Sequence, residues 1–201
     1  MSCCRSGTML AVVSTLLGLV SLTSALYSAI SNHMFPCPTV LAQPDADIDK
    51  LLGPWHLSIL VVDATEEDFV ESGVCVSGEL QRYNHSTVRQ VWTMQTVTTS
   101  QEEGEPLAVI EMPTTVIKPG IWAVHTPLGG EVKATVFESD PQAYMLMNYC
   151  GWHNGVLVHL WTAAVTRSRI LTPIFRRHLI SLLEDHGFHF MHSKIVSWHG
   201  C

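Results

Sequence analysis

The stretch Val74–Thr98, VCVSGELQRYNHSTVRQVWTMQTVT, indicates the fold class. Two runs of residues that favour strands are separated by a short polar turn at Asn84-His85-Ser86. This arrangement is typical of a β-hairpin. The stretch therefore predicts two neighbouring antiparallel strands.

The same pattern continues on both sides of this hairpin. Turn residues such as Gly, Pro, Asn and Asp punctuate the chain at short intervals. Further strands are predicted at Pro54–Val62, Pro106–Ile117, Ile121–Thr126, Glu131–Glu138, Ala143–Cys150 and Leu157–Val165. About eight short strands at this spacing predict an antiparallel barrel or sandwich.

One helix follows the strands. Thr172 is suited to the N-cap, Pro173 to the first helical position and Gly187 to the C-terminal end. Between them, apolar residues recur with helical spacing and form one stripe: Phe175, Leu179, Leu182 and Leu183. We expect this stripe to pack against the outside of the sheet. Phe188–Trp198 is predicted to form one more short strand.

The N-terminal residues are typical of a signal peptide. Arg5 precedes an uncharged run, Met9–Leu26, and small residues at Thr23 and Ala25 fit cleavage after Ala25. We therefore expect a cleaved signal peptide at 1–25 and a single domain at 26–201. A retained membrane anchor is the alternative, because the run is near the lower length limit for a span.

The charge balance excludes some classes of partner. The chain has 18 acidic and 11 basic residues and a formal net charge of −7. With no basic cluster, nucleic acid is a poor candidate partner. No later apolar run is long enough to cross a bilayer, so we do not expect a membrane-spanning protein.

Four cysteines remain after the predicted cleavage: Cys37, Cys75, Cys150 and Cys201. An even count after a signal peptide predicts two disulfides, for which three pairings are possible. The sequence Asn84-His85-Ser86 is a sequon, and we expect a glycan on Asn84. Both features are typical of a secreted, extracellular protein.

The order of these features resembles the lipocalin family, and within it the apolipoprotein D and insect bilin-binding branch. The resemblance runs from about Cys37 to Cys201. It includes the Gly53-Pro54-Trp55 motif at the first strand, Cys75 at the start of the second, and Cys150 at the end of the seventh. It also includes Arg167, four residues before Leu171 and the helix, and a final cysteine. The family's Thr-Asp-Tyr motif is Thr135-Val136-Phe137 in this chain.

The resemblance implies an eight-stranded up-and-down barrel with the helix packed outside. It implies that Gly53 and Trp55 begin the first strand at the closed base and that Arg167 lies across the Trp55 indole. It also implies the pairings Cys37–Cys150 and Cys75–Cys201. An eight-stranded barrel is wide enough for one small ligand, which gives the chain an expected function.

Alternate residues of each strand then face the ligand, with a register that a one-residue slip would invert. We expect Val76, Gly78 and Leu80 to face inward, with Gln90, Trp92, Met94 and Thr96 on the next strand. On the eighth strand, His159, Trp161, Ala163 and Val165 are expected inside. The predicted ligand-binding residues are Leu80, Trp92, Met94, Thr96, Trp122, Met145, Met147, Trp161 and Ala163. This aromatic and methionine-rich lining suits a sterol, retinoid, carotenoid, bilin or fatty acid, and Gln90 or Thr96 is a candidate to orient a polar group.

The expected function is extracellular binding and transport of a small hydrophobic ligand. The alternative is a protein-interaction or defence lipocalin with no physiological small ligand, whose partner is a cell-surface receptor or another protein.

An enzyme would need Cys75 as a reactive thiolate, and a disulfide between Cys75 and Cys201 would remove that thiolate. We therefore expect no enzyme activity and no cofactor. His186, His189, His192 and His199 lack a metal-ligand spacing, so no metal or haem is expected. The sequence leaves the oligomeric state open.

Overall fold

The computed structural model describes residues 35–63, 74–96, 106–127, 130–188 and, for the backbone alone, 193–197. The chain divides into two compact units, residues 1–34 and 35–201, and every described residue belongs to the second. The predicted signal peptide and its cleavage site lie outside the described residues.

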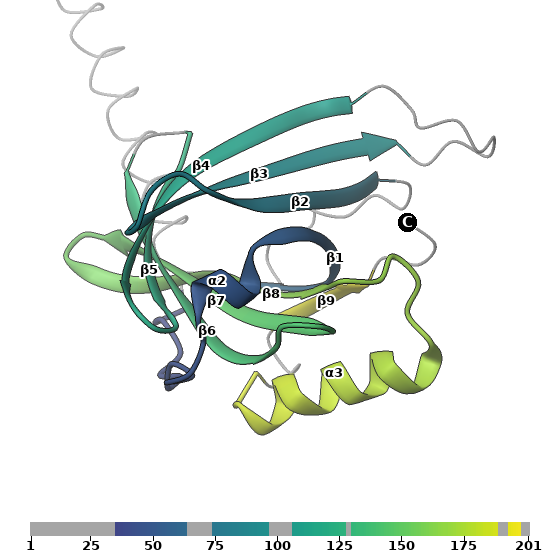
Figure 1. Cartoon of the computed structure of the whole chain (residues 1–201). Helices are drawn as coiled ribbons and strands as arrows, with labels where there is room; N and C mark the ends of the chain where they lie inside the picture. The colour runs from purple at the N-terminus through teal and green to yellow at the C-terminus, as the bar shows by residue number, and fades with distance from the viewer. Residues whose placement is uncertain (1–34, 64–73, 97–105, 128–129, 189–192, 198–201) are drawn as a thin grey trace, which may run out of the picture. The chain divides into compact units, whose positions relative to one another are not determined.

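A closed barrel of antiparallel strands forms the body of this unit (Figure 1). Its strands are β1 (Gly53–Asp63), β2 (Val74–Arg82), β3 (Thr87–Thr96), β4 (Pro106–Lys118), β5 (Ile121–His125), β6 (Glu131–Asp140), β7 (Tyr144–His153) and β8 (Val156–Thr166). Each strand pairs with the next along the chain, and β1 pairs with both β2 and β8 to close the ring. The predicted barrel is confirmed.

The barrel closes at β1, which changes its neighbour halfway along. Residues 53–56 pair with β2 on one edge, whereas residues 59–63 pair on that edge with β9 (Ser193–Ser197). On the other edge β1 pairs with β8 over residues 56–61. The strand predicted within Phe188–Trp198 is thus present, and it covers the part of β1 that β2 leaves.

The helix α3 (Pro173–Asp185) lies on the outside of the barrel wall (Figure 1). Thr172 caps its first turn by accepting a hydrogen bond from Phe175 N, as predicted. Gly187, with φ of 86°, ends it, and Phe188 N donates back to the carbonyl of Leu183. The buried face of the helix packs on the outer residues of β1, β6, β7 and β8, namely Ile59, Val61, Phe137, Leu146 and Ala164.

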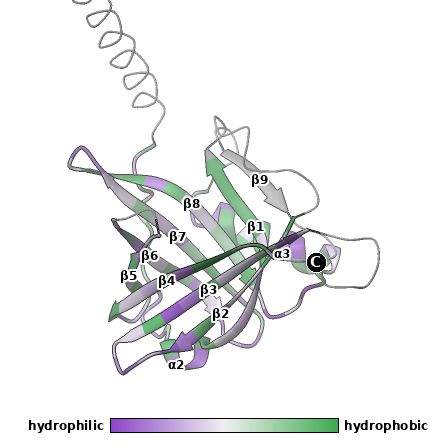
Figure 2. Ribbon diagram, turned by 90° about the horizontal axis from the view of Figure 1, so that it is seen from above, coloured by the Kyte–Doolittle hydropathy of each residue, from purple (hydrophilic) through white to green (hydrophobic). Residues whose placement is uncertain are grey.

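The interior of the barrel holds a separate and larger apolar core. Because side chains alternate along a strand, each strand contributes every second residue to it. Hydrophilic and hydrophobic residues accordingly mix along β2 and β3 (Figure 2). The two ends of the barrel differ: a short helix, α2 (Ile48–Leu51), precedes β1 at one end, whereas β1 ends and β2 begins at the other. These are called the closed end and the open end below.

Candidate functional site

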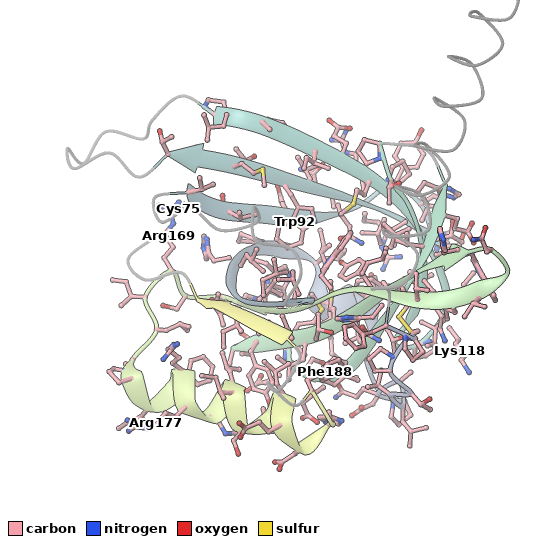
Figure 3. All side chains as sticks on the ribbon, turned by 180° about the vertical axis from the view of Figure 1, so that it is seen from behind. Cys75, Trp92, Lys118, Arg169, Arg177 and Phe188 are labelled. Atoms are coloured by element: carbon pink, nitrogen blue, oxygen red, sulfur yellow. A yellow bond between two sulfur atoms is a disulfide. The ribbon has the colours of Figure 1, made fainter. Side chains whose placement is uncertain are left out.

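Most of the predicted ligand-binding residues are on the inner face of the barrel. Trp92 projects from β3 into the interior (Figure 3), and the packing of the barrel core places other candidates beside it. The inward-facing candidates are Leu80, Trp92, Met94, Trp122, Met145, Met147, Trp161 and Ala163. Thr96 is at the open end of β3 and is exposed.

These residues differ in depth, and the difference divides the barrel into two halves. Leu80, Trp122, Met145 and Met147 are at most 1% exposed and belong to a solid core toward the closed end. Trp92, Met94 and Trp161 remain partly exposed although they point inward. An inward-facing side chain that solvent still reaches marks an interior that is open at that level. The open half is therefore the candidate site.

The lining of this open half is apolar and aromatic. Trp161 stacks on Tyr149 with ring centroids 5.1 Å apart. Close to Trp161 lie the buried side chains of Leu60, Val62 and Ala163. On the opposite wall, the partly exposed residues Ala108 and Ile110 of β4 add to the lining. These two residues are not among the predicted ligand-binding residues, although they pair with Met94 and Trp92 in the β3–β4 hairpin and so share their inward face.

A polar bridge separates the two halves. Tyr149 is on β7 and Gln90 is on β3, four strands away in an eight-stranded ring, so the two residues face each other across the barrel. The Tyr149 hydroxyl donates to Gln90 Oε1 at 3.2 Å. Burial raises the pKa of this hydroxyl, which stays protonated and remains a donor.

Gln90 is the centre of this bridge and is itself fully buried. Its Nε2 donates to Thr114 Oγ1 at 2.9 Å, and its Oε1 also accepts from Trp92 Nε1 at 3.1 Å. Both lone pairs of the amide oxygen are therefore occupied. The sequence makes Gln90 a candidate to orient a ligand; in the structure its amide oxygen holds Trp92 and Tyr149 in place instead.

The closed end is sealed by Trp55 and Arg167. The guanidinium carbon of Arg167 is 3.6 Å from the centroid of the Trp55 ring, and Trp55 Nε1 donates to the carbonyl of Leu51 at 2.8 Å. The guanidinium donates to the backbone carbonyls of Pro54 (2.8 Å), Leu52 (3.0 Å), Pro141 (3.0 Å) and Lys50 (3.3 Å). One side chain thus joins three segments that converge on the base. Gly53, with φ of 98°, begins β1 beside it.

A disulfide joins Cys37 to Cys150, as the resemblance implied. The segment before β1 reaches β8 at this point, where Cys37 N donates to the carbonyl of Leu157 at 2.9 Å and Pro36 pairs with Val158. Cys75 is also disulfide-bonded, so it offers no free thiolate. Its predicted partner, Cys201, lies outside the described residues.

The prediction that His159 faces inward is wrong. A bulge in β8 places Trp161 opposite Tyr149 but His159 opposite Cys150, so Leu160 is the extra residue. The bulge turns His159 to the outer face, where its Nε2 is 2.9 Å from Thr162 Oγ1. Leu160 packs on the barrel core in its place. A bulge inserts one residue and shifts the alternation beyond it, which the sequence pattern does not reveal.

Two further predicted features are on the surface. Asn84 is exposed in the β2–β3 turn, where its Oδ1 accepts from the backbone N–H groups of Ser86 and Thr87. The ring centroids of His186 and Phe137 are 4.8 Å apart, and His186 Nε2 is 3.6 Å from Glu138 Oε2. The other histidines of the C-terminal group, His189, His192 and His199, lie outside the described residues. Within the described ranges, no three potential metal ligands gather, and no helix has the length and apolarity needed to cross a membrane.

Solved structures with the same barrel architecture superpose on this chain. The siderocalin Ex-FABP, described as functioning through dual ligand specificities, superposes with a TM-score of 0.55 and 12% identity, over 76% of this chain and 95% of that chain. Lobster apocrustacyanin A1 superposes with a TM-score of 0.54 and 12% identity, over 83% and 92%. The chain has the lipocalin fold. Its lipocalin barrel is recognised by structure alone, since no family model and no curated protein matches the sequence.

Proposed function

We propose that this chain is a secreted member of the lipocalin family that binds and transports a small apolar molecule in the open half of its barrel. The observation that carries the proposal is the partial exposure of inward-facing Trp92, Met94 and Trp161 above a solid, buried floor. Flat indole surfaces combined with an adaptable methionine suit a rigid, extended apolar ligand. Sterols, retinoids and carotenoids have this shape.

Secretion is part of the proposal. Long-range disulfides persist in oxidising compartments and are rare in the cytosol. The Cys37–Cys150 bond closes a sequence separation of 113 residues, and Cys75 is disulfide-bonded as well. The exposed Asn84 turn is accessible to a glycosylation enzyme. These observations support the predicted signal peptide, glycan and extracellular location.

A pair of neighbouring substitutions on β4 tests where the ligand binds. Ala108 pairs with Met94 and faces inward, whereas Val109 faces outward and is exposed. Ala108→Phe adds bulk inside the open half and is expected to lower the affinity for a bound polyene at least tenfold. Val109→Phe adds a similar ring outside and is expected to leave the affinity unchanged. Native mass spectrometry and polyene fluorescence measure the binding.

Equal binding by both variants would place the ligand elsewhere. Failure of the parent protein to bind any sterol, retinoid, carotenoid, bilin or fatty acid would remove the carrier proposal. The protein-interaction lipocalin, with a receptor or other protein as its partner, would then be the better description.

A further inference from the structure

One side of β4 is unpaired in the half of the barrel that contains the candidate site. On its other side β4 pairs with β3 from Pro106 to Thr115. Pairing with β5 begins only at Thr114, and β5 itself has five residues. β4 therefore continues beside β3 well past β5 (Figure 1). We call the unpaired side of residues 106–113 the β4 edge; among the described strands, none pairs with it.

The free backbone groups of this edge belong to every second residue. In an antiparallel strand, successive residues direct their N–H and C=O groups alternately to the two neighbouring strands. Val116 N donates to the carbonyl of Ser86, on the β3 side, at 2.8 Å. Counting back along β4, Val109, Glu111 and Pro113 direct their groups to the opposite side. The N–H groups of Val109 and Glu111 thus lie along the β4 edge, without a partner in the described part of the chain.

Proline occurs at the two ends of the β4 edge and not within it. Pro106 begins the strand, and Pro113 has no N–H group to donate. Prolines on an edge strand limit the stretch that can pair with another strand. Between them lies the apolar run Leu107–Ile110, in which the Val109 side chain is 55% exposed. The edge therefore suits one short strand.

We propose that the β4 edge pairs in antiparallel orientation with the β4 edge of a second copy of this chain. An antiparallel edge is complementary to itself, because a twofold axis brings the N–H groups of one copy opposite the C=O groups of the other. A register centred on Ile110 places Val109 of each copy opposite Glu111 of the other. In this register, each free N–H group of Val109 and Glu111 donates to a carbonyl of the other copy.

The charges at the edge are compatible with this self-pairing. Glu111 Oε2 is 3.4 Å from Arg89 Nη1 of the same chain. The two Glu111 side chains occupy diagonal positions across the twofold axis, and each has its own arginine beside it. The residue directly opposite each carboxylate is the uncharged Val109. Like charges directly opposite each other, which would oppose the pairing of two identical strands, are therefore avoided.

The second copy would also extend the wall of the open half. Ala108 and Ile110 face inward, are partly exposed, and alternate with the residues that form the β4 edge. A strand paired with this edge continues the sheet beside them. The interface is thus next to the proposed ligand site, although neither one requires the other.

Proline at position 109 tests the pairing, because it removes a free N–H group and no hydrogen bond of the barrel. Pro113 already occupies an equivalent position on the same strand. We expect dimers of the secreted protein in sedimentation equilibrium. Val109→Pro should raise the dimer dissociation constant at least tenfold, since each copy loses one donor to the other. Glu111→Pro removes the other free N–H group and should act in the same way.

The matched control is Val109→Thr, which keeps the N–H group and the branched shape and should leave the dissociation constant nearly unchanged. Hydrogen exchange of the parent protein gives a second measurement that needs no variant. The amides of Val109 and Glu111 are expected to exchange more slowly as the protein concentration rises, because pairing with a second copy protects them.

A parent protein that is monomeric at every concentration up to its solubility limit would overturn the proposal, whether the edge then binds another protein or nothing. A dimer that both proline variants leave intact would overturn it, because the contact would lie elsewhere. Equal weakening by Val109→Thr would overturn it as well, since the side chain would then hold the copies together. Ligand binding, measured separately, would decide the carrier function in each case.

Discussion

The indole of Trp92 lies directly over Gly78, its partner on β2, so closely that a Cβ atom at Gly78 would be 2.3 Å from Cε3 of the ring. No real Cβ tolerates such a contact, so the glycine is required for the ring to occupy this position. The hydrogen bond from Trp92 to Gln90 holds the other edge of the ring. The glycine thus determines the shape of one wall of the candidate site.

Gly78→Ala is expected to displace Trp92 into the open half and break its hydrogen bond to Gln90. We expect a loss of about 1–3 kcal/mol in the free energy of unfolding, as for other overpacked interiors, and a shift in tryptophan fluorescence. Gly151→Ala is the matched control, because the added methyl there would meet only the end of the flexible Leu160 side chain at 3.1 Å. Similar effects in both variants would contradict the assigned role of Gly78.

The bridge across the barrel can be tested by removing one hydroxyl. Tyr149→Phe leaves Gln90 with its bonds to Trp92 and Thr114, and should cost about 1 kcal/mol of stability. Gln90→Met keeps the length of the side chain but leaves three donors or acceptors without their partner, and should cost more. Urea unfolding measures both. A larger loss for Tyr149→Phe than for Gln90→Met would show that Gln90 is not the centre of the network.

The guanidinium geometry of Arg167, and not its charge alone, is expected to stabilise the closed end. Arg167→Ala removes four hydrogen bonds to carbonyls and the contact with Trp55, and we expect a loss of about 3 kcal/mol in the free energy of unfolding. Arg167→Lys keeps the charge but cannot reach several carbonyls in a planar fork, so it should recover less than half of that loss. Full recovery with lysine would show that charge alone is sufficient.

Removal of the Cys37–Cys150 disulfide is expected to destabilise the barrel without opening the site. The double variant Cys37→Ser/Cys150→Ser avoids a free thiol, and the long closed loop gives an expected cost of about 4–5 kcal/mol. Ligand affinity at low temperature should change little, because both cysteines are on the outer side of the wall. A large loss of affinity in a variant that is still folded would contradict this separation.

His56 is expected to lower stability in mild acid. Burial, and then the charge of Arg169, lower its pKa from the usual value of 6.5. The folded protein therefore binds a proton less readily than the unfolded chain. This penalty is absent well above pH 6.5 and grows as the pH falls below it, until the folded state also takes up the proton. Melting temperatures between pH 7.5 and 5.5 should fall more for the parent protein than for His56→Gln. The same dependence of melting temperature on pH in both proteins would contradict the lowered pKa of His56.

Local patterns predicted the elements because local chemistry determines them. Turn residues marked the ends of β1 to β8, and Thr172, Pro173 and Gly187 bounded the helix that the structure contains. The resemblance supplied the closed barrel and the Cys37–Cys150 pair. Alternation also placed Leu80, Trp92 and Trp161 inside.

Three features could not be predicted from local patterns. The bulge at Leu160 reversed the direction of His159, because one extra residue changes the alternation. The depth of each inward-facing residue depends on strand tilt, so buried Met145 and partly exposed Met94 looked alike in sequence. The pair formed by Tyr149 and Gln90, 59 residues apart, exists only because the ring brings β7 opposite β3.

The change of neighbour along β1 has a consequence for biosynthesis. Residues 59–61 pair with β8 on one edge and with β9 on the other, and both partners come more than a hundred residues later. A ribosome therefore releases this half of β1 long before either of its partners exists. Contacts so distant in sequence slow folding, and an unpaired apolar strand edge invites association with other chains in the meantime. The second half of β1 is made early but its partners are made late, and this interval is when a nascent chain would most need a chaperone.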